Sequence, residues 1–336
     1  PQIYAWSGGG GRRGDAGGVA AHGGGGWAAG RRWDWGGGGG RGGGSGGAAG
    51  AGPRVHIVQP NINQQEKWVK GLERRNFARL AGLTGAPEAE PRLILWPEAA
   101  VPDYLEDEPW AAQRLARLLG PRDLLMTGGV AIEWDRQGNA IGARNSMFVL
   151  DARARLLDRY DKAHLVPYGE YLPMRPILSA MGLSRLAPGD LDFWPGPGPR
   201  SFVLPGFGTV GVQICYEIIF SGHVLDRAHR PAFLFNPSND AWFGPSGPPQ
   251  HLAQTRLRAI EEGIAVVRAT PTGISAVIDP DGRLVASLPQ GRAGAIERRL
   301  DGPRPPTPFS SHGNLLPMLF AALLVLAAFA HRRFAR

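Results

Sequence analysis

A chain of 336 residues is long enough for one large domain or for two domains of ordinary size. Its single cysteine excludes an internal disulfide and any metal site that needs several cysteines. A formal net charge of +8 does not by itself imply nucleic acid, because spread-out arginines are equally suited to anionic lipid headgroups.

The first 53 residues differ in composition from the rest of the chain. They hold 24 of the 50 glycines, no leucine and no continuous apolar run. Such a segment cannot bury enough apolar surface to offset its ordering entropy, so we expect residues 1–53 to be disordered, and neither a signal peptide nor a membrane span. Gly/Arg-rich binding of nucleic acid is one alternative. A shifted reading frame in GC-rich DNA explains the composition better, and the first residue, Pro1, suggests a gene fragment.

Residues 54–301 show alternating strand-like and helix-like patterns. Apolar, β-prone runs predict strands, in chain order, at Val55–Gln59, Leu93–Trp96, Leu124–Ile132, Ser146–Asp151, Val210–Ile214, Ala232–Asn236, Ser275–Asp279 and Gly294–Arg298. Helical periodicity predicts helices at Gln64–Leu83, Trp110–Leu119, Glu217–His229 and Gln250–Val266. The alternation indicates one layered α/β domain. The pattern alone does not distinguish a four-layer sandwich from a doubly wound sheet.

Three reactive residues each follow a separate predicted strand. Glu98 comes after the run Leu93–Trp96 and Pro97, Lys162 ends a strand-like run, and Cys215 follows Val210–Ile214. Alone, a single cysteine is usually a small buried hydrophobe, and a Glu or a Lys is usually a surface charge. Together they predict a base, an oxyanion stabiliser and a nucleophile. We expect Cys215 on a strand-to-helix turn, where backbone N–H groups and the helix dipole favour the thiolate.

Longer motifs surround these residues. The most specific are Tyr160-Asp-Lys-Ala-His-Leu-Val-Pro-Tyr-Gly-Glu170, Cys215-Tyr-Glu217 and Asn236-Pro-Ser-Asn-Asp-Ala-Trp-Phe-Gly244, accompanied by Val58-Gln-Pro-Asn-Ile62, Trp68, Trp96-Pro-Glu98, Gln250-His-Leu-Ala253 and Arg258-Ala-Ile-Glu261. The set resembles the nitrilase (carbon–nitrogen hydrolase) superfamily and, within it, the apolipoprotein N-acyltransferase family. The resemblance runs from about residue 55 to residue 336.

The resemblance implies a fold and a reaction. The fold would be a four-layer αββα sandwich over residues 54–301. Glu98 would take the proton of Cys215, whose thiolate attacks a phospholipid ester, typically that of phosphatidylethanolamine. Lys162 and a backbone N–H near Tyr216 would stabilise the oxyanion. The resulting thioester would acylate the N-terminal amine of a diacylglyceryl apolipoprotein, with no cofactor and with ping-pong kinetics.

The resemblance also implies supporting residues, each with a plainer structural alternative. Glu170, Tyr216 and Glu217 would support the triad. Glu170 could instead form a structural ion pair, and Glu217 could be a carboxylate favoured in the first turn of a helix. Substrate contacts would come from Trp68, Asn239, Trp242 and Phe243, which could equally be a core tryptophan and turn residues with exposed aromatics. His164 and His251 lack a third ligand at useful spacing, so we expect no metal.

The C-terminus carries an apolar segment followed by arginines. We expect a linker at 302–313, a transmembrane helix at 314–331 and a basic cytoplasmic tail at 332–336. A buried core helix is the alternative. A basic cytoplasmic end places the catalytic domain on the periplasmic side of a bacterial inner membrane.

Two departures from the family leave other functions open. We expect this chain to lack the transmembrane bundle that precedes the family's catalytic domain, and Pro271 stands where many members have Asn. A nitrilase-superfamily amidase, which uses water as the acyl acceptor, is one alternative. An inactive, membrane-anchored remnant is the other.

Overall fold

The computed structural model describes residues 50–67, 69, 71–174, 180 and 192–334. The glycine-rich segment, except for residues 50–53, lies outside the described residues, and so do Trp68 and residues 335–336 of the basic tail.

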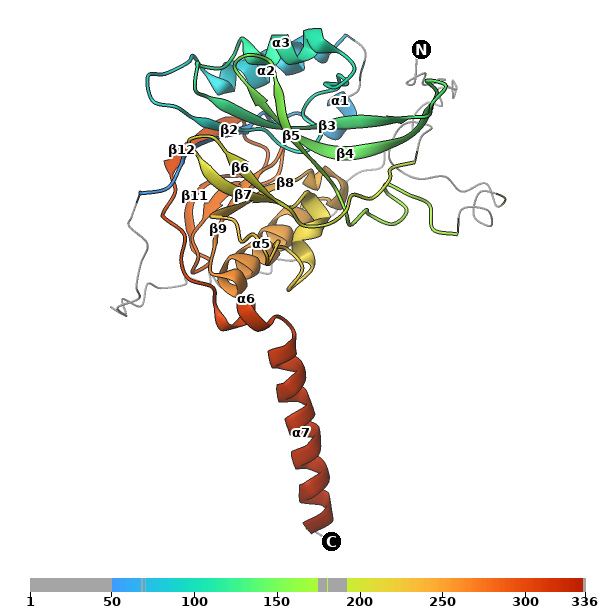
Figure 1. Cartoon of the computed structure of the whole chain (residues 1–336), viewed down its shortest axis with the longest axis vertical. Helices are drawn as coiled ribbons and strands as arrows, with labels where there is room; N and C mark the ends of the chain where they lie inside the picture. The colour runs from blue at the N-terminus through green and yellow to red at the C-terminus, as the bar shows by residue number, and fades with distance from the viewer. Residues whose placement is uncertain (1–49, 68, 70, 175–179, 181–191, 335–336) are drawn as a thin grey trace, which may run out of the picture. The chain divides into compact units, whose positions relative to one another are not determined.

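Two six-stranded mixed sheets form the centre of the fold (Figure 1). The first has the order β12-β1-β2-β3-β4-β5, with bounds Gly294–Arg299, Arg54–Gln59, Leu93–Leu95, Leu124–Trp134, Ala140–Asp151 and Leu156–Asp161. The second has the order β11-β10-β9-β8-β7-β6, with bounds Leu284–Leu288, Ser275–Ile278, Ala265–Ala269, Phe233–Pro237, Gly208–Val212 and Ser201–Leu204. Strands β1, β2 and β3 are parallel, as are β7, β8 and β9, and the remaining neighbours are antiparallel.

Helices cover the outer face of each sheet, which makes four layers (Figure 1). Helices α2 (Glu73–Thr84) and α3 (Pro109–Ala116) pack on the first sheet, and α5 (Gly247–Glu262) packs on the second. The position of strand β2 between two layers explains why its sequence is apolar throughout. Leu93 and Leu95 face the second sheet, whereas Ile94 faces the helices, because successive side chains alternate and both faces are covered. The expected αββα sandwich is confirmed.

The predicted helix boundaries agree less well with the structure than the predicted sandwich does. The single helix expected at Gln64–Leu83 is two, α1 (Gln64–Lys67) and α2, with Gly71 between them at a φ of +91°. Helix α5 ends at Glu262 because Gly263 adopts the left-handed conformation, and the apolar run behind it forms β9. Strands β6, β9 and β11 were not expected from the sequence.

The helix expected at Glu217–His229 was wrong. Only a short 3₁₀ helix, η1 (Cys215–Ile219), follows β7, after which Phe220 is extended and Gly222 has a φ of +77°. Apolar periodicity in this stretch reflects burial of Ile218, Val224 and Leu225 against β8 and α5, which irregular backbone achieves equally well.

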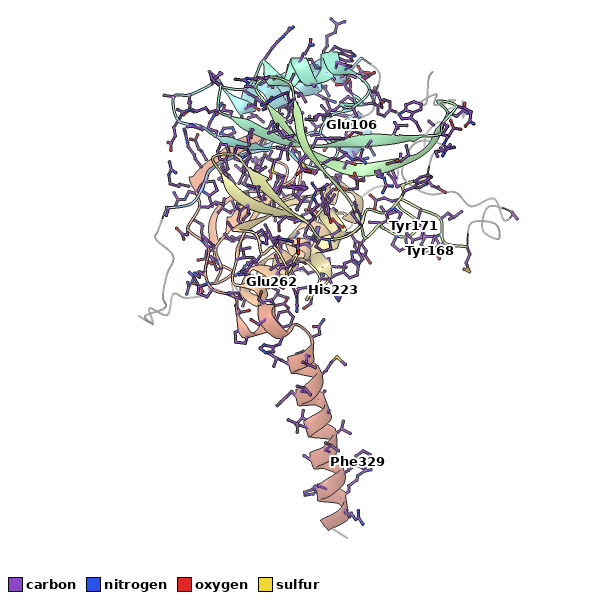
Figure 2. The ribbon with its side chains drawn as sticks, in the orientation of Figure 1. Glu106, Tyr168, Tyr171, His223, Glu262 and Phe329 are labelled. Carbon is purple, nitrogen blue, oxygen red and sulfur yellow. The ribbon has the colours of Figure 1, made fainter. Side chains whose placement is uncertain are left out.

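The C-terminal segment is helical and apolar. Helix α6 (Pro308–His312) is followed by α7 (Leu315–Phe334), whose residues Leu315–Arg333 are long and apolar enough to cross a membrane. Its side chains from Leu315 to Arg333 are exposed, as Phe329 illustrates in Figure 2. This exposure favours a membrane span over a buried core helix, the alternative left open by the sequence.

Candidate active site

Glu98 is held by a tight turn at the carboxyl end of β2. Pro97 ends the strand, and Ala99 takes a left-handed φ of +47°. Gly128 of β3 packs directly under this turn, where a Cβ atom would lie 2.3 Å from the amide nitrogen of Ala99. The close packing leaves the Glu98 side chain 6% exposed and directs it toward β4 and β5.

Lys162 lies one residue beyond β5 and forms two buried ion pairs. Its Nζ is 3.3 Å from Oε1 of Glu98 and 3.0 Å from Oε1 of Glu170. Asn145 of β4 donates from Nδ2 to the same two oxygens, at 2.7 Å and 2.8 Å. The second oxygen of Glu170 accepts from the backbone N–H of Val166 at 2.8 Å. Asn145 was missed because its surrounding sequence is an ordinary strand.

The two carboxylates of this cluster determine the protonation state of Lys162. Burial opposes the charge on Lys162, but the Glu170 and Glu98 carboxylates outweigh burial and raise the pKa of Lys162 above its usual value. Lys162 is therefore an ammonium at neutral pH, and it can donate to a developing oxyanion but cannot act as a base.

Cys215 sits at the junction of β7 and η1 with a left-handed φ of +49°. The backbone amide of Asn239 hydrogen-bonds to its sulfur, and both Glu98 and Lys162 act on it electrostatically. Burial and the Glu98 carboxylate raise the pKa of Cys215 above the usual thiol value, and Lys162 offsets only part of that rise. The expected preference for a thiolate was therefore wrong, because the turn is buried beside a carboxylate. The thiol needs a base.

Glu217 joins the two strand ends that carry Lys162 and Cys215. Its carboxylate accepts from the backbone N–H groups of Ile214, Ala163 and His164 at 2.7, 2.7 and 3.2 Å, and from the Tyr160 hydroxyl at 2.9 Å. Its partners are thus backbone amides and a hydroxyl on both sides of the site. The neighbouring Tyr216 is partly exposed and packs its ring edge-on against Phe220 at 5.1 Å.

The other candidate residues differ in how much of each the structure describes. The side-chain amide of Asn239 donates to Oε1 of Gln64 at 2.6 Å, linking the loop after β8 to α1. Trp242 and Phe243 belong to the 3₁₀ helix η2 (Asp240–Phe243), but their side chains lie outside the described structure. Trp68 lies outside it altogether.

Lys67, which sequence reasoning missed, contacts the turn that carries the base. Its Nζ donates to the main-chain carbonyl of Glu98 at 3.0 Å. Burial lowers the pKa of Lys67 to about 8, against the attraction of Glu98. The adjacency of Lys67 to the motif residue Trp68 was the one sequence signal that could have found it.

A small, mainly apolar depression lies beside Glu98. Phe77 and Leu80 of α2, the loop at residues 97–102 and Pro271 line it. Proline at position 271, which the sequence marked as a departure from the family, therefore adds apolar surface next to the base.

A second buried network lies behind Cys215. The donor atoms of Cys215, Asp240 and His251 fall within 4.8 Å of one another, an arrangement compatible with a metal ion. Arg268, however, places Nη2 2.7 Å from Oδ1 of Asp240 and 3.1 Å from Nδ1 of His251. A guanidinium thus already supplies the positive charge there, and we interpret the cluster as a hydrogen-bond network.

This fold and site agree with a known family. The model of the carbon–nitrogen hydrolase family matches residues 54–303. The chain belongs to the carbon–nitrogen hydrolase family. Its relatives include the apolipoprotein N-acyltransferases of Bradyrhizobium diazoefficiens, 38% identical over 291 residues, and of Agrobacterium fabrum, 36% identical over 288 residues. Both alignments cover 84% of this chain and 54% of the relative, so the chain spans about half the length of these proteins.

Carbon–nitrogen hydrolases of known structure share the fold at low identity. Saccharomyces cerevisiae Nit3 superposes with a TM-score of 0.52 at 20% identity, covering 74% of this chain and 90% of Nit3. An amidase from Nesterenkonia sp. gives a TM-score of 0.52 at 19% identity, covering 76% and 92%. These likenesses concern the fold alone.

Proposed function

We propose that this chain carries the catalytic domain of an apolipoprotein N-acyltransferase, which transfers a fatty acyl group from a phospholipid to a protein amine. The observation that carries the proposal is the buried Glu98–Lys162–Glu170 cluster facing the turn of Cys215. The relatives that carry this name, at 36–38% identity, favour acyl transfer over other chemistries of the family.

The first half-reaction forms a thioester. Glu98 accepts the thiol proton as the sulfur of Cys215 attacks the ester carbonyl, because the raised pKa keeps the thiol protonated at rest. Lys162, an ammonium, and the backbone N–H of Tyr216 stabilise the tetrahedral oxyanion. The S–C bond forms, the ester C–O bond breaks, and Glu98 returns the proton to the departing lysophospholipid.

The second half-reaction makes an amide. A neutral amine attacks the thioester carbonyl, the C–N bond forms and the C–S bond breaks. Glu98 takes the proton of the amine and delivers it to the departing sulfur, which restores the thiol. Two substrates then use one site in turn, so the kinetics are ping-pong.

The supporting residues have separate roles in this scheme. Glu170 and Asn145 fix Lys162 and Glu98 relative to each other. Glu217 fixes the turn of Cys215 relative to the end of β5. Tyr216, Trp68, Asn239, Trp242 and Phe243 contribute to substrate binding around the thiol.

The substrates and the location follow from the same proposal. The acyl donor is phosphatidylethanolamine, and the acceptor is the N-terminal cysteine amine of a diacylglyceryl apolipoprotein. Helix α7 spans the bacterial inner membrane. Arg332 and Arg333 mark its cytoplasmic end, which puts the catalytic domain on the periplasmic side.

The test is acyl transfer between defined substrates. The full chain in detergent is incubated with phosphatidylethanolamine and a diacylglyceryl lipopeptide with a free N-terminus, beside the same lipopeptide with an acetylated N-terminus. We expect an amide-linked acyl group on the free peptide alone, and none with Cys215→Ala. Release of free fatty acid or hydrolysis of small amides without peptide acylation would instead indicate an amidase-like hydrolase.

A further inference from the structure

A charge network is buried directly behind the nucleophile and takes no part in the proton transfers described above. His251, Asp240 and Arg268 come from α5, η2 and β9, and they are 8%, 1% and 0% exposed. Fully buried charges are costly unless they are paired, so a paired set at this depth requires a compensating benefit. The network lies within 4.8 Å of the Cys215 sulfur, and it hydrogen-bonds to the main chain of Cys215.

That contact is with the carbonyl oxygen of Cys215. Nε2 of His251 lies 3.0 Å from it, and the side-chain amide of Asn236 lies 3.5 Å from it. A carbonyl oxygen only accepts, so Nε2 carries a proton and donates to it. Nδ1 lies 2.9 Å from Oδ1 of Asp240 and 3.1 Å from Nη2 of Arg268, and burial and Arg268 lower the pKa of His251.

Arg268 also orients both donors. Its Nη2 donates to Asp240, which lies 2.9 Å from Nδ1 of His251, and its Nη1 donates to Oδ1 of Asn236 at 2.5 Å. The network therefore fixes the direction of one carbonyl group through two separate side chains.

The direction of this carbonyl sets the direction of the next N–H. The peptide bond between Cys215 and Tyr216 is planar and trans, so its C=O and N–H point in opposite directions. A left-handed residue such as Cys215 is intrinsically disfavoured, and its peptide plane needs external support.

We propose that His251 is a positioning residue, which holds the carbonyl of Cys215 from behind and so aims the N–H of Tyr216 at the oxyanion. Asp240 and Arg268 hold His251 in the required orientation. This inference rests on the proposed acyl-transfer chemistry, but it concerns any acyl donor that forms a tetrahedral oxyanion on Cys215.

Two reagents separate an oxyanion effect from general damage to the turn. In acylation by p-nitrophenyl butyrate, the S–C bond forms through an oxyanion, p-nitrophenolate leaves and Glu98 takes the thiol proton. In alkylation by iodoacetamide, the S–C bond forms at a saturated carbon, iodide leaves and no oxyanion arises. Both act on the only cysteine of the chain.

We expect His251→Leu to slow acylation by about 10- to 100-fold. A misdirected N–H donor loses part or all of its stabilisation of the oxyanion, so the rate loss can reach that caused by removing the donor. Alkylation should stay within about threefold of the unsubstituted chain, since it needs no oxyanion donor. The matched control is His56→Leu. His56 is 7% exposed, and its ring contacts the carbonyl of Leu83 in α2 at 2.8 Å and Glu297 of β12 rather than the turn of Cys215, so neither rate should change.

A pair of amide substitutions keeps the test valid if the leucine variant does not fold. The amide of His251→Gln reaches the position of Nε2, whereas that of His251→Asn is too short. Glutamine should restore most of the acylation rate and asparagine should not. Equal slowing of both reactions, or unchanged acylation in the leucine and asparagine variants, would overturn the inference. Failure of phosphatidylethanolamine alone, with p-nitrophenyl butyrate still active, would count against the proposed function instead.

Discussion

At the scale of single residues, the site is a set of buried charges that neutralise one another. Lys162 is 1% exposed and pairs with two carboxylates, while Asn145 satisfies both of them with hydrogen bonds. Removing one member of such a set leaves an unpaired buried charge, which costs far more than a surface ion pair contributes. The cluster is therefore both the proposed catalytic apparatus and a determinant of the stability of the fold.

Replacement of Lys162 should show how much the cluster contributes to the free energy of unfolding. We expect Lys162→Met to lower the free energy of unfolding by about 3–5 kcal/mol at pH 8, because Glu98 and Glu170 are left without their cation. The raised pKa of Lys162 means that its contribution is fully present below the usual lysine pKa and is lost only as pH rises through the folded value.

Thermal unfolding from pH 5 to pH 8 checks this, with Arg155→Met as the control. Arg155 is an exposed side chain whose partner Asp151 also accepts from two backbone N–H groups, so removal of Arg155 should cost at most about 1 kcal/mol. A Lys162 variant as stable as the Arg155 variant would contradict the buried-charge account.

Removal of the base should have opposite effects on two reactions of the same thiol. The Glu98 carboxylate helps to raise the pKa of Cys215, so Glu98→Gln should lower that pKa and increase the thiolate fraction. We expect iodoacetamide to alkylate the variant about three- to tenfold faster at pH 8, whereas acyl transfer falls at least about 100-fold for lack of the base. Slower alkylation would show that the carboxylate does not oppose the thiolate.

At the scale of elements, the site is built where parallel strands end. Strands β2 and β7 are each parallel to a neighbour, and each delivers a reactive residue just past its carboxyl end. The turn after β2 is fixed from below by Gly128 of β3, which has no room for a side chain. The position of the base thus depends on a residue in a neighbouring strand.

Adding a single methyl group at position 128 should test this packing. We expect Gly128→Ala to lower the free energy of unfolding by about 1–3 kcal/mol and to slow acylation at least about tenfold, because the turn of Glu98 must shift. Gly82→Ala is the control, since Gly82 lies within α2 with open space around it and should gain about 0.5–1 kcal/mol. Unchanged acylation in Gly128→Ala would show that the turn is not held by β3.

How far the sequence predicted these elements depended on the type of signal. The strands that deliver Glu98 and Cys215 were found because they are short apolar runs whose last residues are buried. The strand before Lys162 has one buried residue, Tyr160, and was found from its position in the Lys162 motif. The helix after Cys215 was wrong because its apolar spacing is satisfied by an irregular turn that the Glu217 carboxylate stabilises. Asn145 and the Arg268 network could not be predicted, since their importance arises from contacts between distant strands.

At the scale of the whole molecule, an α/β domain is followed by an apolar helix. Helix α7 exposes leucines and phenylalanines along its length and ends in arginines. An exposed apolar surface of this kind is unfavourable in water, and the proposed membrane span removes it.

Charges placed in the middle of α7 should release the chain from membranes. We expect the full chain to remain with the membrane through alkaline carbonate extraction, and the double variant Leu323→Arg/Leu326→Arg to be extracted, because each central arginine costs about 2.5–3.5 kcal/mol. Leu284→Arg, at an exposed leucine of β11, is the control and should change nothing. Retention of the double variant would mean that another part of the chain holds it.

The most direct test of the account is the intact mass of the full chain after incubation with phosphatidylethanolamine, beside Cys215→Ala. The account predicts a fatty-acyl mass increment that hydroxylamine removes and that the alanine variant lacks, which identifies a thioester on Cys215. No increment, or an equal increment on the alanine variant, would contradict the claim that Cys215 takes an acyl group from a phospholipid.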